Sequence, residues 1–144
     1  MITIFAACIT VFIDQFVKYL VYENMELGET IPLVKNIFHL TYISNPGAAF
    51  GIFPHQDLFF LAIVGVLFAA FIFLRNRIPS RPVYFPVAVG FLLGGALGNA
   101  IDRVRFGGVV DFLDFRVWPI FNVADIAICL GVTLIVFYFW RHDS

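Results

Sequence analysis

The sequence predicts an all-α integral membrane protein with four transmembrane helices and a small extracytoplasmic β-sheet or hairpin. Of its 144 residues, 61% are hydrophobic and only 13% are charged, and the mean hydropathy is +0.93. Soluble domains are about 45–50% apolar and about 25% charged, and a small sphere cannot hide this much apolar surface from water. The composition therefore excludes a soluble or disordered chain and predicts one membrane-embedded domain over residues 1–144.

Four segments are apolar and long enough to cross a hydrocarbon core of about 30 Å at about 1.5 Å per residue. Lipid offers no hydrogen-bond partner to a free backbone, so each segment is expected to be an α-helix. The chain start has no basic region and no obvious cleavage site, so we expect the first span to remain as an anchor. The predicted spans are residues 3–22, 58–74, 82–101 and 121–140.

The loop between the second and third spans sets the predicted orientation, because it contains Arg75, Arg77 and Arg81. By the positive-inside rule this loop is cytoplasmic, which places both termini inside and the two longer connections outside. The first outer connection agrees, since Lys35 is its only basic residue. Three arginines of the other outer connection argue mildly against it: Arg103, Arg105 and Arg116.

The first outer connection is expected to form the β-element. Residues 37–43 (IFHLTYI) are rich in β-branched and aromatic side chains, and residues 32–34 precede them across a Lys35-Asn36 turn. This pattern predicts a hairpin or a small sheet.

Glycines recur along the third span, where Gly90, Gly94 and Gly98 lie four residues apart and Gly95 is adjacent. Small residues at this spacing let membrane helices approach closely, so we expect a packing role. The Gly107-Gly108 pair fits a hinge or a simple turn, and the sequence does not choose between them.

Several kinds of chemistry find no support in the sequence. A net charge of -1 leaves no basic stripe for nucleic acid. Cys8 and Cys129 lie in apolar runs and are expected to be free, packed thiols. No Ser-His or Cys-His pair is evident, because His39, His55 and His142 lie in the first outer connection and the tail. With no metal-ligand pattern either, no metal and no cofactor are expected.

Acids and amides of three spans and one connection gather at one predicted depth, near the outer interface. An ionisable residue at mid-membrane costs at least about 2.5–3.5 kcal/mol and is a functional hypothesis by default. Helical rise places Asp14 and Lys18 in the outer half of the first span, where their i,i+4 spacing favours a structural ion pair. Arg103 would either snorkel to headgroups or pin a peptide carbonyl or phosphate. The rest of the layer is Asn99, Asp102, Asp111, Asp114, Asn122 and Asp125.

Two carboxylates held together in a low-dielectric cleft cannot both ionise, so they share a proton. One then acts as general base on water while the protonated one polarises a peptide carbonyl. Composition alone leaves the pairing open among Asp102, Asp111, Asp114 and Asp125.

Five short motifs occur in order along nearly the whole chain, and together they resemble the bacterial lipoprotein signal peptidases (signal peptidase II). Each motif alone is weak, whereas five in register on four spans make a specific match. They are residues 14–18 (DQFVK), 45–50 (NPGAAF), 94–103 (GGALGNAIDR), 109–112 (VVDF) and 121–125 (FNVAD).

The resemblance implies an aspartic endopeptidase of the bacterial cytoplasmic membrane. It would act on lipidated precursor lipoproteins as a monomer in contact with membrane lipid, cutting just before a diacylglyceryl-cysteine on the extracytoplasmic side. By motif position Asp111 and Asp125 would be catalytic, whereas Asp114 matches no catalytic position and is expected to be a solvated loop acid. Substrate-binding positions would be Asn45, Gly47, Asn99, Arg103 and Asn122, and supporting positions Asp14, Lys18, Asp102 and Ala124.

Two other classes of function could use the same residues. A channel or proton-coupled transporter could use the acids as a relay, but it should place polar residues through the whole bilayer depth. The inner halves of these spans are nearly bare of charge. A non-catalytic assembly factor could use the glycines and ion pairs, but it leaves the cluster of acids and amides unexplained.

Overall fold

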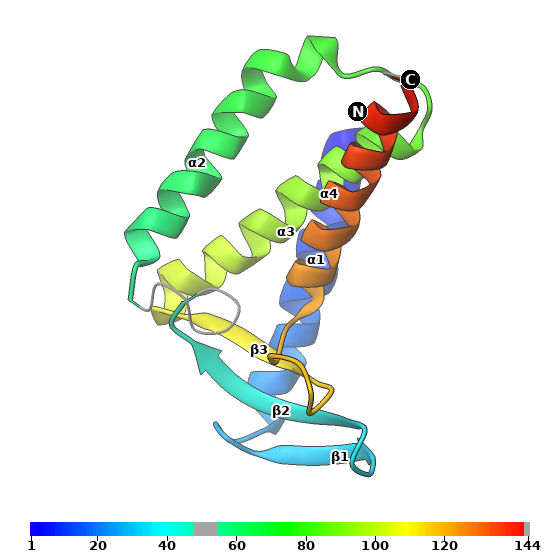
Figure 1. Cartoon of the computed structure of the whole chain (residues 1–144). Helices are drawn as coiled ribbons and strands as arrows, with labels where there is room; N and C mark the ends of the chain where they lie inside the picture. The colour runs from blue at the N-terminus through cyan, green and yellow to red at the C-terminus, as the bar shows by residue number, and fades with distance from the viewer. Residues whose placement is uncertain (48–54, 143–144) are drawn as a thin grey trace.

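The structure is a computed structural model that describes residues 1–47 and 55–142. These residues form four long helices, and Figure 1 shows a small sheet at one end of them and both chain termini at the other. All four helices are long and apolar enough to cross a membrane, which confirms the predicted fold class. The helices are α1 (Ile2–Asn24), α2 (Asp57–Leu74), α3 (Tyr84–Phe106) and α4 (Val123–His142).

Helix α3 is the centre of the bundle, and its glycines make close packing possible. A Cβ on Gly94 would lie 2.7 Å from the Ala7 backbone oxygen of α1. A Cβ on Gly95 would lie 2.5 Å from the Ala124 backbone oxygen of α4. Helices α1 and α4 therefore pack on two sides of α3, as the glycine spacing predicts.

Helix α2 stands apart from this three-helix core (Figure 1) and has no buried residue. Among the described residues it packs mainly against α3. A short 3₁₀ turn at Arg75–Arg77 follows it and leads into the connection to α3.

The sheet has three antiparallel strands in the order β1-β2-β3, namely β1 (Thr30–Val34), β2 (Phe38–Asn45) and β3 (Val109–Asp114). The predicted hairpin is confirmed as β1 and β2. The third strand was expected to be part of a loop, but it pairs with β2 and places Ile43 opposite Asp111. The sheet is joined to α1 by a core of Val21, Met25, Val110 and Phe112.

The helix bounds differ from the predicted spans mainly at α3 and α4. Helix α3 continues to Phe106, so that Asn99 and Asp102 lie inside it rather than at its end. It ends at Gly107, which adopts the left-handed conformation (φ 68°) that glycine permits and donates its N–H to the Arg103 oxygen (3.0 Å). Gly107 therefore forms part of a turn. Helix α4 begins at Val123 rather than at residue 121.

The prediction for the two cysteines is right about their oxidation state and wrong about their burial. Cys8 and Cys129 are free, but both are exposed rather than packed. The reason is that each lines an open groove: Cys8 lies between α1, α2 and α3, and Cys129 faces the cavity described below.

Candidate active site

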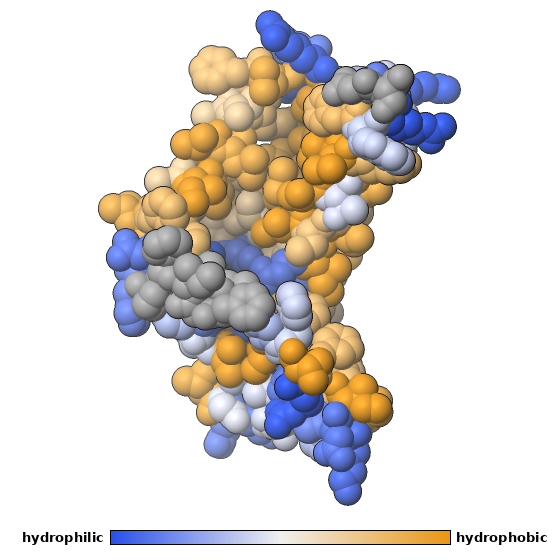
Figure 2. Space-filling view, in the orientation of Figure 1, coloured by the Kyte–Doolittle hydropathy of each residue, from blue (hydrophilic) through white to orange (hydrophobic). Residues whose placement is uncertain are grey.

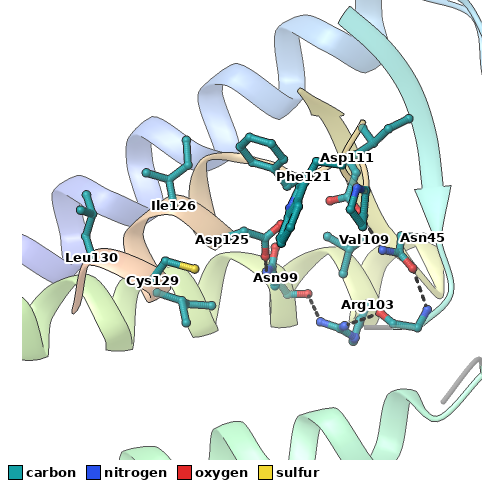
Figure 3. A pocket seen from close by; sticks show the side chains of 15 residues that line it. Asn45, Asn99, Arg103, Val109, Asp111, Phe121, Asp125, Ile126, Cys129 and Leu130 are labelled. Carbon is teal, nitrogen blue, oxygen red and sulfur yellow. Dashed lines mark hydrogen bonds between the residues drawn. The ribbon is translucent and has the colours of Figure 1, made fainter. Parts of the chain in front are cut away.

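A cavity of about 470 Å³ opens between the C-terminal end of α3, the N-terminal half of α4 and the neighbouring part of the sheet. Figure 3 shows its polar side chains at the sheet end and its apolar side chains along α4. The polar lining consists of Asn45, Asn99, Arg103, Asp111 and Asp125. The apolar lining includes Val109, Trp118, Pro119, Ile120, Phe121, Ile126, Ile128, Cys129 and Leu130.

Asp111 and Asp125 come from different elements and meet at this cavity. Strand β3 presents Asp111, and the first turn of α4 presents Asp125. Asn122 donates from Nδ2 to Asp111 Oδ1 (2.7 Å) and to Asn99 Oδ1 (3.0 Å). Asn99 in turn donates from Nδ2 to Asp125 Oδ1 (2.8 Å). A chain of two amides therefore joins the two carboxylates.

Asn122 also caps the N-terminus of helix α4. Its Oδ1 accepts the Asp125 N–H (2.9 Å), while Asp125 Oδ2 accepts the Asn122 N–H (3.1 Å). This reciprocal pair is a capping box, with aspartate in the place of the usual glutamate. The cap fixes both side chains to the helix start, and Asn122 is fully buried there.

A buried ionic cluster lies beneath the amides. Lys18 Nζ contacts Asp14 Oδ2 (2.9 Å) and Asp102 Oδ2 (2.8 Å), so the ion pair expected between Asp14 and Lys18 is present. Lys18 also donates to Asn99 Oδ1 (2.9 Å). Because that oxygen accepts from both Lys18 and Asn122, the Asn99 amide nitrogen has to face Asp125.

The acids of this cluster hold neighbouring elements in place. Asp14 Oδ1 accepts the Ala124 N–H (2.8 Å) in the first turn of α4. Asp102 Oδ2 accepts the Val110 N–H (3.0 Å) of β3. Strand β3, which carries Asp111, and helix α4, which carries Asp125, are therefore both held by this cluster.

Gln15 belongs to the same cluster, although it is not among the site residues predicted from the sequence. Its Nε2 donates to Asp102 Oδ1 (2.9 Å), to the Gly98 oxygen (3.1 Å) and to Asp14 Oδ2 (3.2 Å). The available signal was an uncharged polar residue beside Asp14 in an otherwise apolar span.

Arg103 lines the cavity and donates to a backbone carbonyl of this chain. Its Nη2 donates to the Gly47 oxygen (3.0 Å), and its guanidinium lies over the Phe60 ring (4.4 Å). Asn45 Oδ1 accepts the Gly47 N–H (3.0 Å), and Asn45 Nδ2 donates to Asp111 Oδ2 (2.8 Å). Residues 48–50 of the same motif lie outside the described residues.

The environment of Asp111 favours its protonated form. Burial, and then the nearby charge of Asp125, raise the pKa of Asp111 to about 7, against the lowering effect of hydrogen bonds from Asn45 and Asn122. Near neutral pH this carboxyl can therefore hold or release a proton, as the shared-proton hypothesis requires.

Asp114 corrects an expectation, because it is buried (4% exposed) rather than solvated. It accepts hydrogen bonds from Thr41 Oγ1 (2.7 Å) and from the Arg116 N–H (2.8 Å). Burial acts to raise the pKa of Asp114, but these bonds and the Arg116 charge outweigh it and hold the pKa below its usual value. It does not line the cavity. Pairing of β3 with β2 is what buries it.

Among the described residues, no group of three or more His, Cys, Asp or Glu is arranged to hold a metal ion.

Comparison with known proteins gives consistent matches over nearly the whole chain. The family model described as Signal peptidase (SPase) II matches residues 6–141. The lipoprotein signal peptidase of Halothermothrix orenii is 44% identical, over 94% of this chain and 93% of that protein. The lipoprotein signal peptidase of Brevibacillus brevis is 47% identical, over 90% and 89%.

A solved structure described as that of a bacterial membrane enzyme is 33% identical and superposes with a TM-score of 0.90. The match covers 99% of this chain and 89% of that one. The fold and the sequence thus agree, and the chain belongs to the signal peptidase II family.

Proposed function

We propose that this protein is an aspartic endopeptidase that removes the signal peptide from diacylglyceryl-modified prolipoproteins. It cuts immediately before the lipidated cysteine, at the outer face of the bacterial cytoplasmic membrane. Its relatives are named lipoprotein signal peptidases. The observation that carries the mechanism is the Asp111–Asp125 pair, joined through two amides at the polar end of an otherwise apolar cavity.

The two carboxylates have different roles in this mechanism. Asp125 accepts hydrogen bonds from the Asn99 side-chain amide and from the Asn122 backbone N–H. It lies at the N-terminus of α4, where the helix dipole favours negative charge. Asp111 has a pKa of about 7 and carries the shared proton. Asp125 therefore takes a proton from the attacking water while Asp111 donates one to the scissile carbonyl oxygen.

The surrounding residues divide into those that face the substrate and those that hold the site. Arg103, Asn45 and Gly47 lie at the cavity mouth and would hold the peptide backbone of the substrate. Asn99 and Asn122 align the carboxylates and complete this binding set. Support comes from Asp14, Lys18, Asp102 and Ala124.

The apolar part of the cavity suits a lipidated substrate. It continues along α4 from Ile126 to Leu130, and Figure 2 shows hydrophobic surface over the helices on this face. A signal-peptide helix and its acyl chains can lie against such a surface while the scissile bond reaches the polar end. We infer that the enzyme works as a monomer in contact with membrane lipid.

The test is cleavage by the purified protein in detergent or lipid. A precursor peptide with a diacylglyceryl-cysteine should be cut before that cysteine, as read by mass spectrometry. The same peptide without the lipid should be cut far more slowly. Cleavage of both peptides at equal rates, or of neither, would contradict the proposal.

A further inference from the structure

The loop from Phe115 to Phe121 forms one wall of the cavity. The bridge between Leu113 and Phe121 closes it, with hydrogen bonds from Leu113 N to Phe121 O (2.8 Å) and from Phe121 N to Leu113 O (3.1 Å). Figure 1 shows this loop between β3 and α4. The residues of the loop that line the cavity are Trp118, Pro119, Ile120 and Phe121.

Asp114 clamps the start of this loop to the sheet. Its Oδ1 accepts the Arg116 backbone N–H (2.8 Å), and its Oδ2 accepts Arg116 Nη1 (2.9 Å) and Thr41 Oγ1 (2.7 Å). Thr41 is buried on β2, and its hydroxyl is also within 3.1 Å of Thr30 Oγ1 on β1. Since the Thr41 hydrogen is used on Asp114, Thr30 has to donate to Thr41. The carboxylate thus links the loop to two other strands.

The loop backbone and its rings connect this clamp to the cavity wall. Arg116 adopts the left-handed region (φ 67°), which costs energy for a residue other than glycine and persists where neighbours enforce it. Phe115 stacks on Phe121 with ring centroids 5.9 Å apart, and Phe38 of β2 packs on Phe115 at 4.7 Å. These contacts lie between the clamp and the cavity wall, so displacement of the clamp displaces the wall.

We propose that Asp114 is a positioning residue for substrate binding: it holds the loop from Phe115 to Phe121 as the apolar wall on which the substrate lies. The inference rests on the proposed function. Asp114 does not line the cavity, and its carboxylate is occupied by Thr41 and Arg116. It therefore acts through the loop and takes no part in proton transfer.

The kinetic test uses a matched pair at Thr41. Thr41→Val keeps the side-chain shape but removes the hydrogen bond, whereas Thr41→Ser keeps the hydroxyl. We expect Thr41→Val and Asp114→Asn to raise KM for the lipidated peptide about tenfold, equivalent to about 1.4 kcal/mol. We expect kcat to change little in both variants, and we expect Thr41→Ser to keep the wild-type KM. A loss of kcat at unchanged KM would overturn the proposal, because it would place Asp114 in the chemistry.

Fluorescence of Trp118 tests the loop without reference to activity. Trp118 is already 61% exposed in the intact loop, so the readout is a change in its surroundings. In a Trp140→Phe background, Asp114→Asn and Thr41→Val should change the acrylamide quenching of Trp118, and Thr41→Ser should not. Unchanged quenching in both of the first two variants would overturn the clamp, even if cleavage were normal. If the wild-type protein cuts no lipidated peptide, the proposed function fails while the quenching result still decides the clamp.

Discussion

Side-chain amides connect the two proposed catalytic carboxylates at the scale of single residues. Asn122 both caps α4 and donates to Asp111, while Asn99 donates to Asp125. Each amide is fixed in one orientation by its other bonds. In the proposed mechanism, the proton shared by the carboxylates therefore sits in a network whose donors have little freedom to rearrange.

Asp111→Asn and Asp125→Asn should each lower the cleavage rate by about 10⁴-fold or more, because an amide cannot exchange the shared proton. The double variant should be no slower than either single one, since residues that act as a unit are not additive. The rates are measured on the lipidated peptide, with the exposed Glu26→Gln as a control that keeps wild-type activity. An active Asp125→Asn enzyme would refute the aspartic mechanism.

The pH profile should show a falling limb near pH 7. Asp111 has to be protonated to donate, and its pKa is about 7, so kcat/KM falls as pH rises through that value. The hydrogen bond from Asn45 lowers this pKa, so Asn45→Ala should raise it and move the limb to higher pH. The measurement compares the pH at which the limb falls and not the maximal rate, because Asn45 also lines the cavity. A limb that moves to lower pH would contradict this assignment. Because the two carboxylates interact, the apparent pKa read from this limb describes the Asp111–Asp125 pair and not one residue alone.

The sequence was sufficient to predict which polar residues gather near one end of the helices, but not the burial and the partners of all of them. Helical rise was enough to place Asp14 and Lys18 together, because both lie on one helix. Asp114 was misjudged because its burial depends on Thr41, a residue far away in the chain that only the paired strands bring near. Gln15 was missed because its partners lie on α3.

Close packing against α3 holds the cavity together at the scale of elements. Helix α4 approaches α3 at Gly95, one turn before Asn99, and α1 approaches it at Gly94. The position of Asp125 relative to Asn99 therefore depends on the α3–α4 contact at Gly95, where there is no room for a side chain larger than hydrogen.

Gly95→Ala should destabilise the protein by about 1–3 kcal/mol, the usual cost of overpacking. The new Cβ would lie 2.5 Å from the Ala124 backbone oxygen, so the helices have to separate. Gly65→Ala on α2 is the matched control, since its Cβ would meet nothing within 4 Å. Thermal unfolding in detergent should show a lower Tm for Gly95→Ala only. Equal Tm values for the two variants would show that the α3–α4 contact is loose.

Local sequence patterns predicted the helices and the β1–β2 hairpin. They did not predict strand β3, because it forms by pairing with a strand that is far away in the chain. Apolar length is sufficient for a membrane helix, and β-branched residues beside a turn are sufficient for a hairpin. Strand β3 is short and contains two acids, so its sequence resembles a loop. It becomes a strand because β2 offers it a partner edge. The extension of α3 beyond residue 101 was hidden by the charges of Asp102, Arg103 and Arg105.

The whole molecule has two unlike ends. Both termini and the connection between α2 and α3 lie at one end, and the sheet lies at the other (Figure 1). The cavity adjoins the sheet, since Asn45, Val109 and Asp111 line it. We propose that the arginine-containing end is cytoplasmic, following the positive-inside rule.

Cysteine labelling in intact cells tests this orientation. In a background with Cys8 and Cys129 replaced, a membrane-impermeant thiol reagent should label Glu26→Cys and leave Ser80→Cys unlabelled. Both positions are exposed, so protection reports the membrane side and not burial. Lysed cells serve as the control, in which both should react. The reverse pattern would put the cavity on the cytoplasmic side and contradict the proposed substrate.

The central position of α3 has a consequence for biosynthesis. It is the least apolar of the four helices and the most buried, whereas α2 is the most apolar and has no buried residue. Alone in lipid, α3 would expose Asp102 without its counter-ion, at a cost that Lys18 of α1 removes. Helix α2 can therefore enter the bilayer by itself, but α3 depends on α1. The ribosome delivers α1 first, so the partner that α3 needs is already in the membrane when α3 emerges.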